Sequence, residues 1–241
     1  MFSKIKNTVL TVTSFLMLTV ITISPAYSAK LKLTMATSGS ETDARSVAIA
    51  NVMLPMISDF ADVKVGMITT LSGGGAGLGI DVRDGFMLAI KQSGRTDIEV
   101  VIEDDQRKPD IAVQLADKMV QSEKVDVLTG IIWSNLAMAV VPSVTAQGKF
   151  YLSPNAGPSA LAGAGCHKNY FNVAWQNDNL HEAAGAYANG AGHKNSFILA
   201  PNSPAGKDAL TGYKRFFSGD LAGEIFTKLG QTDYAAEIAQ I

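Results

Sequence analysis

The chain has 241 residues, of which 47% are hydrophobic and 17% charged, with a formal net charge of -2 at pH 7. This balance is typical of a globular protein and excludes both a disordered chain and a bundle of membrane helices. No basic excess exists to attract nucleic acid, which we exclude as a partner. A single cysteine, Cys166, excludes an intrachain disulfide framework and a cysteine-rich metal site.

Residues 1–28 have the pattern of a secretory signal peptide. Two lysines precede an uncharged run over residues 9–23, and small side chains follow at Ala26 and Ser28. The alternative is a membrane anchor, but this run is shorter than the roughly 20 residues that a spanning helix needs. We therefore predict cleavage after Ser28 and export to the periplasm.

Residues 29–62 form an extra segment ahead of the main pattern. We expect a strand at 31–35, a polar loop, and an apolar helix over 44–60 that Pro55 interrupts. The segment is either a first strand and helix of the fold or a foreign start joined at about Asp62. Its sequence, LTMATSGSETDARSVAIANVMLPMISDFA, resembles the opening of solute receptors from tripartite ATP-independent periplasmic transporters, and nothing after Val63 continues that resemblance.

From Val63 onward, short apolar runs alternate with amphipathic stretches, which predicts an α/β fold with parallel sheets. The expected strands are 63–69, 98–102, 125–132, 150–153, 170–174, 197–200 and 223–229. The expected helices are 80–93, 110–122, 134–146, 179–190 and 205–217, with another starting at 233. We divide them into a first lobe at 63–174 and a second at 175–241, and we expect the second lobe to be truncated because the sequence stops inside its last helix.

The loops that follow the strands meet at one edge of such a sheet, where open α/β folds bind ligands. The first of these loops, residues 71–79, is rich in glycine but has neither the GxGxxG nor the GxxxxGK[ST] spacing, so we set nucleotide binding aside. Two interpretations remain: its N–H groups hold an anion, or its small residues permit close packing.

Two later loops suit an anion better. Ser134 follows the third strand, where it is either a helix N-cap or a hydroxyl that binds a carboxylate, with Trp133 as an apolar cover. Asn155, Ala156 and Gly157 follow the fourth strand within the stretch LSPNAGPSA, whose prolines and glycine end the strand in a turn with free amides.

The blocks VKVGMITTLSGGGAGLGIDVRDGFMLAI, VVIEDDQRKPDIAVQLADKMV, VDVLTGIIWSNLAMAVVPSV and FYLSPNAGPSALAGAGC resemble the periplasmic substrate-binding proteins of branched-chain amino acid ABC importers, the leucine/isoleucine/valine-binding family. The resemblance covers residues 63–241. It implies a type I periplasmic-binding fold with two Rossmann-like lobes that close on a small carboxylate ligand. A membrane permease is the implied partner, and the implied protein has no cofactor and is not an enzyme.

The resemblance also implies ligand-binding positions. Ser134 matches the serine after the third strand, and Asn155, Ala156 and Gly157 stand where amides and a hydroxyl hold the carboxylate. Leu78 occupies a place where amino-acid binders often carry a tyrosine. Ser203 lies where the second lobe of such binders commonly offers another tyrosine. Gly157 replaces a threonine that helps to hold an α-amino group. These departures leave aromatic acids and branched-chain amino acids as alternatives.

Other functions and sites fit the residues less well. A sensory domain on the same fold, an α/β hydrolase and a non-functional hybrid are the competing interpretations, and the G-x-S-x-G motif of the hydrolase is absent from the sequence. The three histidines are far apart, which argues against zinc. We interpret residues 103–105, Glu-Asp-Asp, as acids of a turn and Cys166 as a free or intermolecularly paired thiol.

Overall fold

The structure is a computed structural model that describes residues 62–241. The expected signal peptide and nearly all of the extra segment at 29–62 lie outside the described residues. The strands are β1 (Val63–Thr69), β2 (Ile98–Asp104), β3 (Val127–Thr129), β4 (Phe150–Ser153), β5 (Tyr170–Asn172), β6 (Asn195–Pro201) and β7 (Asp220–Thr227). The helices are α3 (Ala76–Ser93), α4 (Pro109–Gln121), α5 (Ser134–Ala146), α6 (Ser159–Ala162), α7 (Asn177–Gly190), α8 (Pro204–Phe216) and α9 (Ala235–Ile238).

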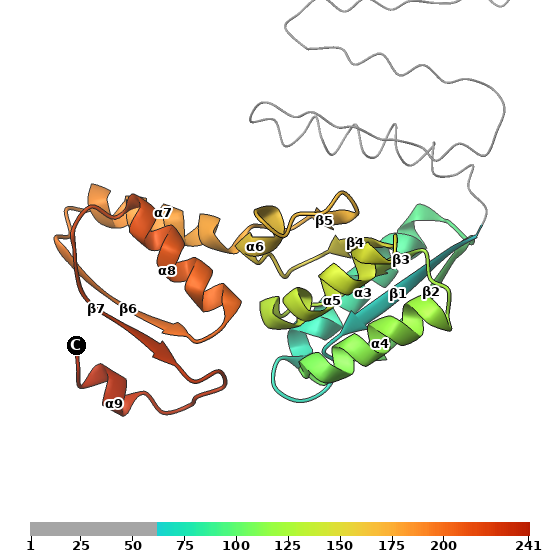
Figure 1. Cartoon of the computed structure of the whole chain (residues 1–241), viewed down its shortest axis with the longest axis horizontal. Coiled ribbons are helices and arrows are strands. Elements are labelled where there is room, and N and C mark those ends of the chain that lie inside the picture. The colour runs from blue at the N-terminus through green and yellow to red at the C-terminus, as the bar shows by residue number, and fades with distance from the viewer. Residues whose placement is uncertain (1–61) are drawn as a thin grey trace, which may run out of the picture.

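Two α/β units lie side by side along the long axis of the molecule (Figure 1). The large lobe comprises β1 to β5 with α3 to α6, and the small lobe comprises β6 and β7 with α7 to α9. All pairs in the five-stranded sheet of the large lobe are parallel, and its strand order is β2-β1-β3-β4-β5. The α/β architecture with parallel sheets is as the sequence predicts.

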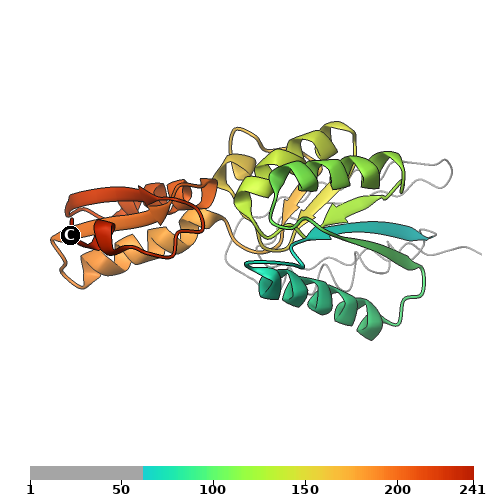
Figure 2. The same cartoon turned by 90° about the horizontal axis from the view of Figure 1, so that it is seen from below.

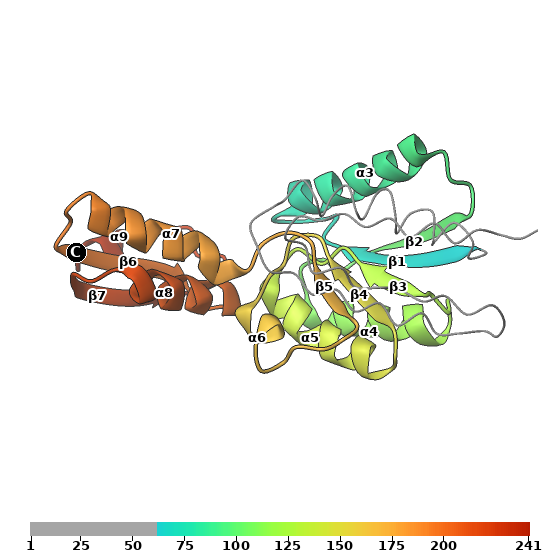
Figure 3. The same ribbon diagram turned by 90° about the horizontal axis from the view of Figure 1, so that it is seen from above.

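The helices of the large lobe cover both faces of its sheet. Helix α3 lies on one face, and α4 and α5 lie on the other, as two perpendicular views of the lobe show (Figures 2 and 3). The main core forms beneath α4 and α5, and it includes the fully buried residues Met119, Leu128, Leu136, Val140 and Tyr151. This core holds the carboxyl ends of β3 and β4 rigidly in place, which fixes the two loops that carry the predicted site.

Glycine allows the two helices of the small lobe to pack closely. A Cβ atom at Gly212 of α8 would lie 2.4 Å from the Asp178 carbonyl oxygen of α7, and one at Gly185 would lie 2.5 Å from the Tyr213 carbonyl oxygen. These helices pack beside the parallel pair formed by β6 and β7. Between residues 62 and 241, no helix has the length and hydrophobicity needed to cross a membrane.

A charged cluster links the start of α7 to the end of α8. The Arg215 guanidinium lies 3.1 Å from the Asp178 carboxylate and also contacts Glu182. Burial by itself raises the pKa of Asp178, but the Ser159 hydroxyl and the Arg215 guanidinium beside it outweigh burial, so the pKa lies below its ordinary value. The charged form of Asp178 therefore stabilises the fold above the unfolded-state pKa of about 3.9, and this stabilisation is lost as pH falls through the lower folded-state pKa.

We expect Arg215→Met to lower the free energy of unfolding at pH 7 by about 2 kcal/mol, because the buried carboxylate of Asp178 loses its cationic partner. Urea unfolding at pH 7 and at pH 3 measures the effect, and the difference from the unmodified chain should shrink at pH 3. Arg83→Met is the matched control, since the Asp84 partner of Arg83 is 62% exposed. Equal losses for the two variants would contradict this account.

Candidate ligand-binding site

Two loops at the carboxyl ends of neighbouring strands converge in the structure. The loop after β3 contains Trp133 and Ser134, and the loop after β4 contains residues 155–157. Strands β3 and β4 are parallel neighbours, which brings these loops to one edge of the sheet. A hydrogen bond from the Asn155 amide nitrogen to the Ile132 carbonyl oxygen, 3.0 Å long, connects the two loops directly.

Ser134 is the first residue of α5 and is buried, with 8% of its surface exposed. The alternative interpretation of Ser134 as an N-cap is wrong, because Trp133 holds the cap position and makes no side-chain cap bond. The Ser134 hydroxyl oxygen instead accepts a hydrogen bond from Asn177 Nδ2 at 3.0 Å. Its proton has no acceptor among residues 62–241.

The turn after β4 presents main-chain donors. The N–H groups of Asn155, Ala156 and Gly157 donate to no acceptor within the described part of the chain. The Ala156 carbonyl oxygen accepts from Ser153 Oγ at 2.5 Å and from Tyr170 Oη at 3.4 Å, which holds the turn in place. Free amides next to a free hydroxyl proton form a set of donors that suits an anion.

Gly157 lies against the crossing between the lobes. A Cβ atom at this position would lie 1.8 Å from the Trp175 carbonyl oxygen, so no side chain fits there. The Gly157 carbonyl accepts the Asn177 N–H at 2.8 Å. Asn177 therefore contacts both predicted loops, since its side chain reaches Ser134 and its main chain reaches Gly157.

Trp133 is held rigidly at the rim of this edge. Its indole nitrogen donates to Thr70 Oγ1 at 2.9 Å, and the Arg107 guanidinium stacks 4.0 Å from the ring centroid. The ring packs on Gly75, where a Cβ atom would lie 2.3 Å away. Close packing thus explains Gly75 in the glycine-rich loop without a bound anion, as the second of the two interpretations proposes.

The buried carboxylate of Asp105 orients Thr70, the hydrogen-bond partner of Trp133. Thr70 Oγ1 donates to Asp105 Oδ1 at 2.6 Å, and the Arg107 N–H donates to the same oxygen at 2.8 Å. Burial raises the pKa of Asp105. Asp104 accepts the N–H groups of Leu71 and Gln106, so both aspartates hold turns, as the sequence interpretation of residues 103–105 expects.

The structure does not bring Leu78 or Ser203 into contact with Ser134. Leu78 lies in the first turn of α3 and is 53% exposed. Ser203 is the N-cap of α8, and its hydroxyl oxygen accepts the Gly206 N–H at 3.2 Å. The predicted ligand contacts of both residues remain predictions.

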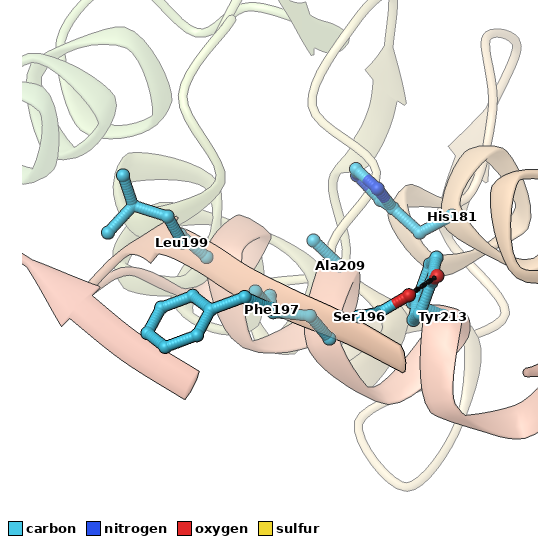
Figure 4. A pocket seen from close by; sticks show the side chains of 8 residues that line it. His181, Ser196, Phe197, Leu199, Ala209 and Tyr213 are labelled. Atoms are coloured by element: carbon cyan, nitrogen blue, oxygen red, sulfur yellow. Dashed lines mark hydrogen bonds between the residues drawn. The ribbon is translucent and has the colours of Figure 1, made fainter. Parts of the chain in front are cut away.

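Two pockets lie away from the place where the loops after β3 and β4 meet. One, of about 280 Å³, lies in the small lobe, where His181 and Phe197 line it and Ser196 Oγ lies 2.6 Å from Tyr213 Oη (Figure 4). A second lies beside the crossing between the lobes and is lined by residues that include Asn172 and Trp175. Neither is lined by Ser134 or Ala156.

Residues 62–241 contain no group of three histidine, cysteine or acidic side chains placed to hold a metal ion. Cys166 is an exposed free thiol. Sequence reasoning identified the two loops but missed Asn177 and Thr70, which contact them, and Asp208, whose Oδ2 accepts from Asn177 Nδ2 at 3.0 Å. No local pattern marks these residues, because their partners are distant in the sequence.

Two α/β lobes with parallel sheets form the architecture of a type I periplasmic binding protein. The family model described as "Periplasmic binding protein" matches residues 62–241, and the chain belongs to this family. The family consists of substrate-binding proteins of transporters. The resemblance of residues 63–241 to this family and the type I fold expected from the sequence are thereby confirmed.

Solved structures agree with this assignment. A solute-binding protein of an ABC transporter from R. palustris, in complex with benzoate, is 30% identical with a TM-score of 0.71, over 75% of this chain and 52% of that chain. A solute-binding protein of an ABC transporter from Rhodopseudomonas palustris BisB5, in complex with 3,4-dihydroxybenzoic acid, is 27% identical with a TM-score of 0.69. The match covers 74% of this chain and 51% of that chain. A leucine-binding protein from Thermotoga maritima, 19% identical with a TM-score of 0.67 over 73% and 52%, shares the fold.

The chain spans about half the length of these solved structures. No curated protein matches it.

Proposed function

We propose that the protein is an extracytoplasmic solute-binding protein of an ABC importer, which captures a small carboxylate and delivers it to a membrane permease. Ligand contacts with both lobes would stabilise a closed state that the permease recognises. The expected signal peptide supports export to the periplasm. The crossing at residues 173–176 is the proposed hinge.

The observation that carries the proposal is the set of free donors at the sheet edge. The Ser134 hydroxyl proton and the N–H groups of residues 155–157 have no acceptors among residues 62–241. Main-chain donors and a hydroxyl on two neighbouring loops suit a carboxylate, because each of its oxygens accepts more than one hydrogen bond. No acidic side chain that would pair with an α-amino group contacts these donors in the described part of the chain.

Aromatic acids are the ligand class we favour. Solved relatives in complex with benzoate or dihydroxybenzoic acid are 30% and 27% identical to this chain, whereas the leucine-binding relative is 19% identical. Gly157 has no room for a side chain that would hold an amine.

We expect Ser134→Ala to weaken benzoate binding by about tenfold to a hundredfold, because a hydrogen bond to a charged group is lost. Calorimetric titration of the full-length protein with benzoate and with leucine measures the effect and ranks the two ligand classes. Ser143→Ala is the control, since Ser143 is an exposed residue of the same helix. Unchanged benzoate affinity in Ser134→Ala, or binding of leucine and of no aromatic acid, would contradict the proposal.

A further inference from the structure

The Asn177 side chain bridges the predicted site and the small lobe. Its Nδ2 atom lies 3.0 Å from Ser134 Oγ and 3.0 Å from Asp208 Oδ2. Asn177 is buried, with 8% of its surface exposed. A carboxamide nitrogen carries two hydrogens, so these two contacts use both of them.

Asp208 determines which way the Asn177 amide faces. Oδ2 of Asp208 also accepts the Ser159 N–H at 3.0 Å. An ionised carboxylate accepts hydrogen bonds and donates none, so the amide nitrogen, and not the amide oxygen, must face Asp208. The same nitrogen then necessarily faces Ser134. The orientation of Asn177 thus follows from the charge on Asp208.

This orientation determines what Ser134 offers to a ligand. With the Asn177 amide as a donor, Ser134 Oγ accepts and its own proton points elsewhere. If Asn177 were turned over, its amide oxygen would take the Ser134 proton, and the hydroxyl would face the ligand as an acceptor. We propose that Asp208 and Asn177 are positioning residues that fix Ser134 as a hydrogen-bond donor and so select carboxylates over neutral carboxamides.

The selectivity rests on the proposed function and on the chemistry of the donors. The N–H groups of residues 155–157 can only donate hydrogen bonds. If Ser134 is also fixed as a donor, every member of the set formed by Ser134 and these N–H groups is a donor. A carboxylate presents two acceptor oxygens, whereas a carboxamide presents one oxygen and one NH₂ group that would face a donor. An unpaired buried donor weakens binding, so benzamide should bind far less well than benzoate.

The first test compares benzoate with benzamide on Asp208→Ala. One oxygen of Asp208, Oδ2, accepts from both Ser159 and Asn177, so only a side chain without an acceptor releases the Asn177 amide from its orientation. We expect the benzoate-to-benzamide affinity ratio, measured by calorimetry on the full-length protein, to fall at least about tenfold. Asp117→Ala, at an exposed position of α4, should leave the ratio unchanged.

A double variant separates positioning from a general structural effect. In Ser134→Ala the oriented hydroxyl is gone, so adding Asp208→Ala should weaken benzoate binding no further. An unchanged affinity ratio in Asp208→Ala, or losses that add in the double variant, would overturn the proposal. If the unmodified protein binds no carboxylate, the proposed function fails and the selectivity fails with it.

The hydrogen-bond arrangement itself is tested without a ligand. In nuclear magnetic resonance spectra of the full-length protein, the side-chain NH₂ protons of Asn177 should exchange with water slowly, and faster in Asp208→Ala. The exposed Asn179 amide of the same helix, which contacts Glu182, is the internal control and should exchange fast in both proteins. Exchange at Asn177 as fast as at Asn179 in the unmodified protein would refute the bridge, whatever the ligand.

Discussion

Gly79→Ala is expected to destabilise the large lobe by about 3 kcal/mol, because the added methyl group collides with main-chain atoms. A Cβ atom at Gly79 would lie 1.9 Å from the Thr70 carbonyl oxygen and 2.9 Å from Thr69 Oγ1. Both contacts belong to the end of β1 and the residue after it, so helix α3 would have to move away from the sheet. Denaturant unfolding followed by circular dichroism measures the loss.

Gly77→Ala is the matched control for this prediction. Gly77 lies two positions earlier in the same helix, and a Cβ atom there would have no heavy atom within 4 Å. Alanine is a better helix former than glycine, so this variant should be stabilised by up to about 1 kcal/mol. If both variants were stabilised, close packing of α3 on β1 would not be the reason for glycine at position 79.

The same helix shows where sequence reasoning stops. We expected α3 to begin at Ile80, and the structure begins it at Ala76. Glycine lowers helix propensity, so residues 73–79 have the composition of a loop. The close approach of Gly79 to Thr70, which the sequence cannot display, requires glycine inside the helix. Tertiary packing therefore overrides local propensity at this point.

Strand β3 is a second element whose bounds differ from those that the sequence predicts. An apolar run over residues 125–132 predicted a strand of that length, but the strand pairs only over Val127–Thr129. Gly130 has a φ of 107° and ends it, and Ile131 is fully buried in the loop that follows. Burial alone keeps a residue apolar, whether or not its main chain pairs with a neighbouring strand. By contrast β1, β4 and α5 have the bounds expected from their sequences.

The part of the candidate site that could be predicted from the sequence is the part that lies directly after the ends of strands. Ser134 and residues 155–157 were found because parallel strands present their carboxyl ends at one edge. The residues that orient them were not found, since Asn177 is 43 positions from Ser134 and Asp208 is 31 positions from Asn177. No local pattern in the sequence reports a contact between residues so far apart.

Gly157→Ala should lower the free energy of unfolding by about 3 kcal/mol and weaken ligand binding, because the methyl group meets the Trp175 carbonyl. The added Cβ atom would lie 1.8 Å from that carbonyl oxygen and 2.8 Å from Asn172 Nδ2. Either the turn after β4 or the crossing between the lobes must then shift. Thermal unfolding and calorimetric titration with benzoate measure the two consequences, with Gly85→Ala as the control at a position where nothing lies within 4 Å.

The same collision bears on the ligand class. A threonine at position 157, which the family resemblance associates with binding an α-amino group, has the same Cβ atom as alanine and should be at least as destabilising. Gly157→Thr is therefore expected to reduce benzoate binding without creating affinity for leucine. A folded Gly157→Thr variant that binds leucine would show that this single position, and not the path of the chain through Trp175, separates aromatic acids from amino acids as ligands.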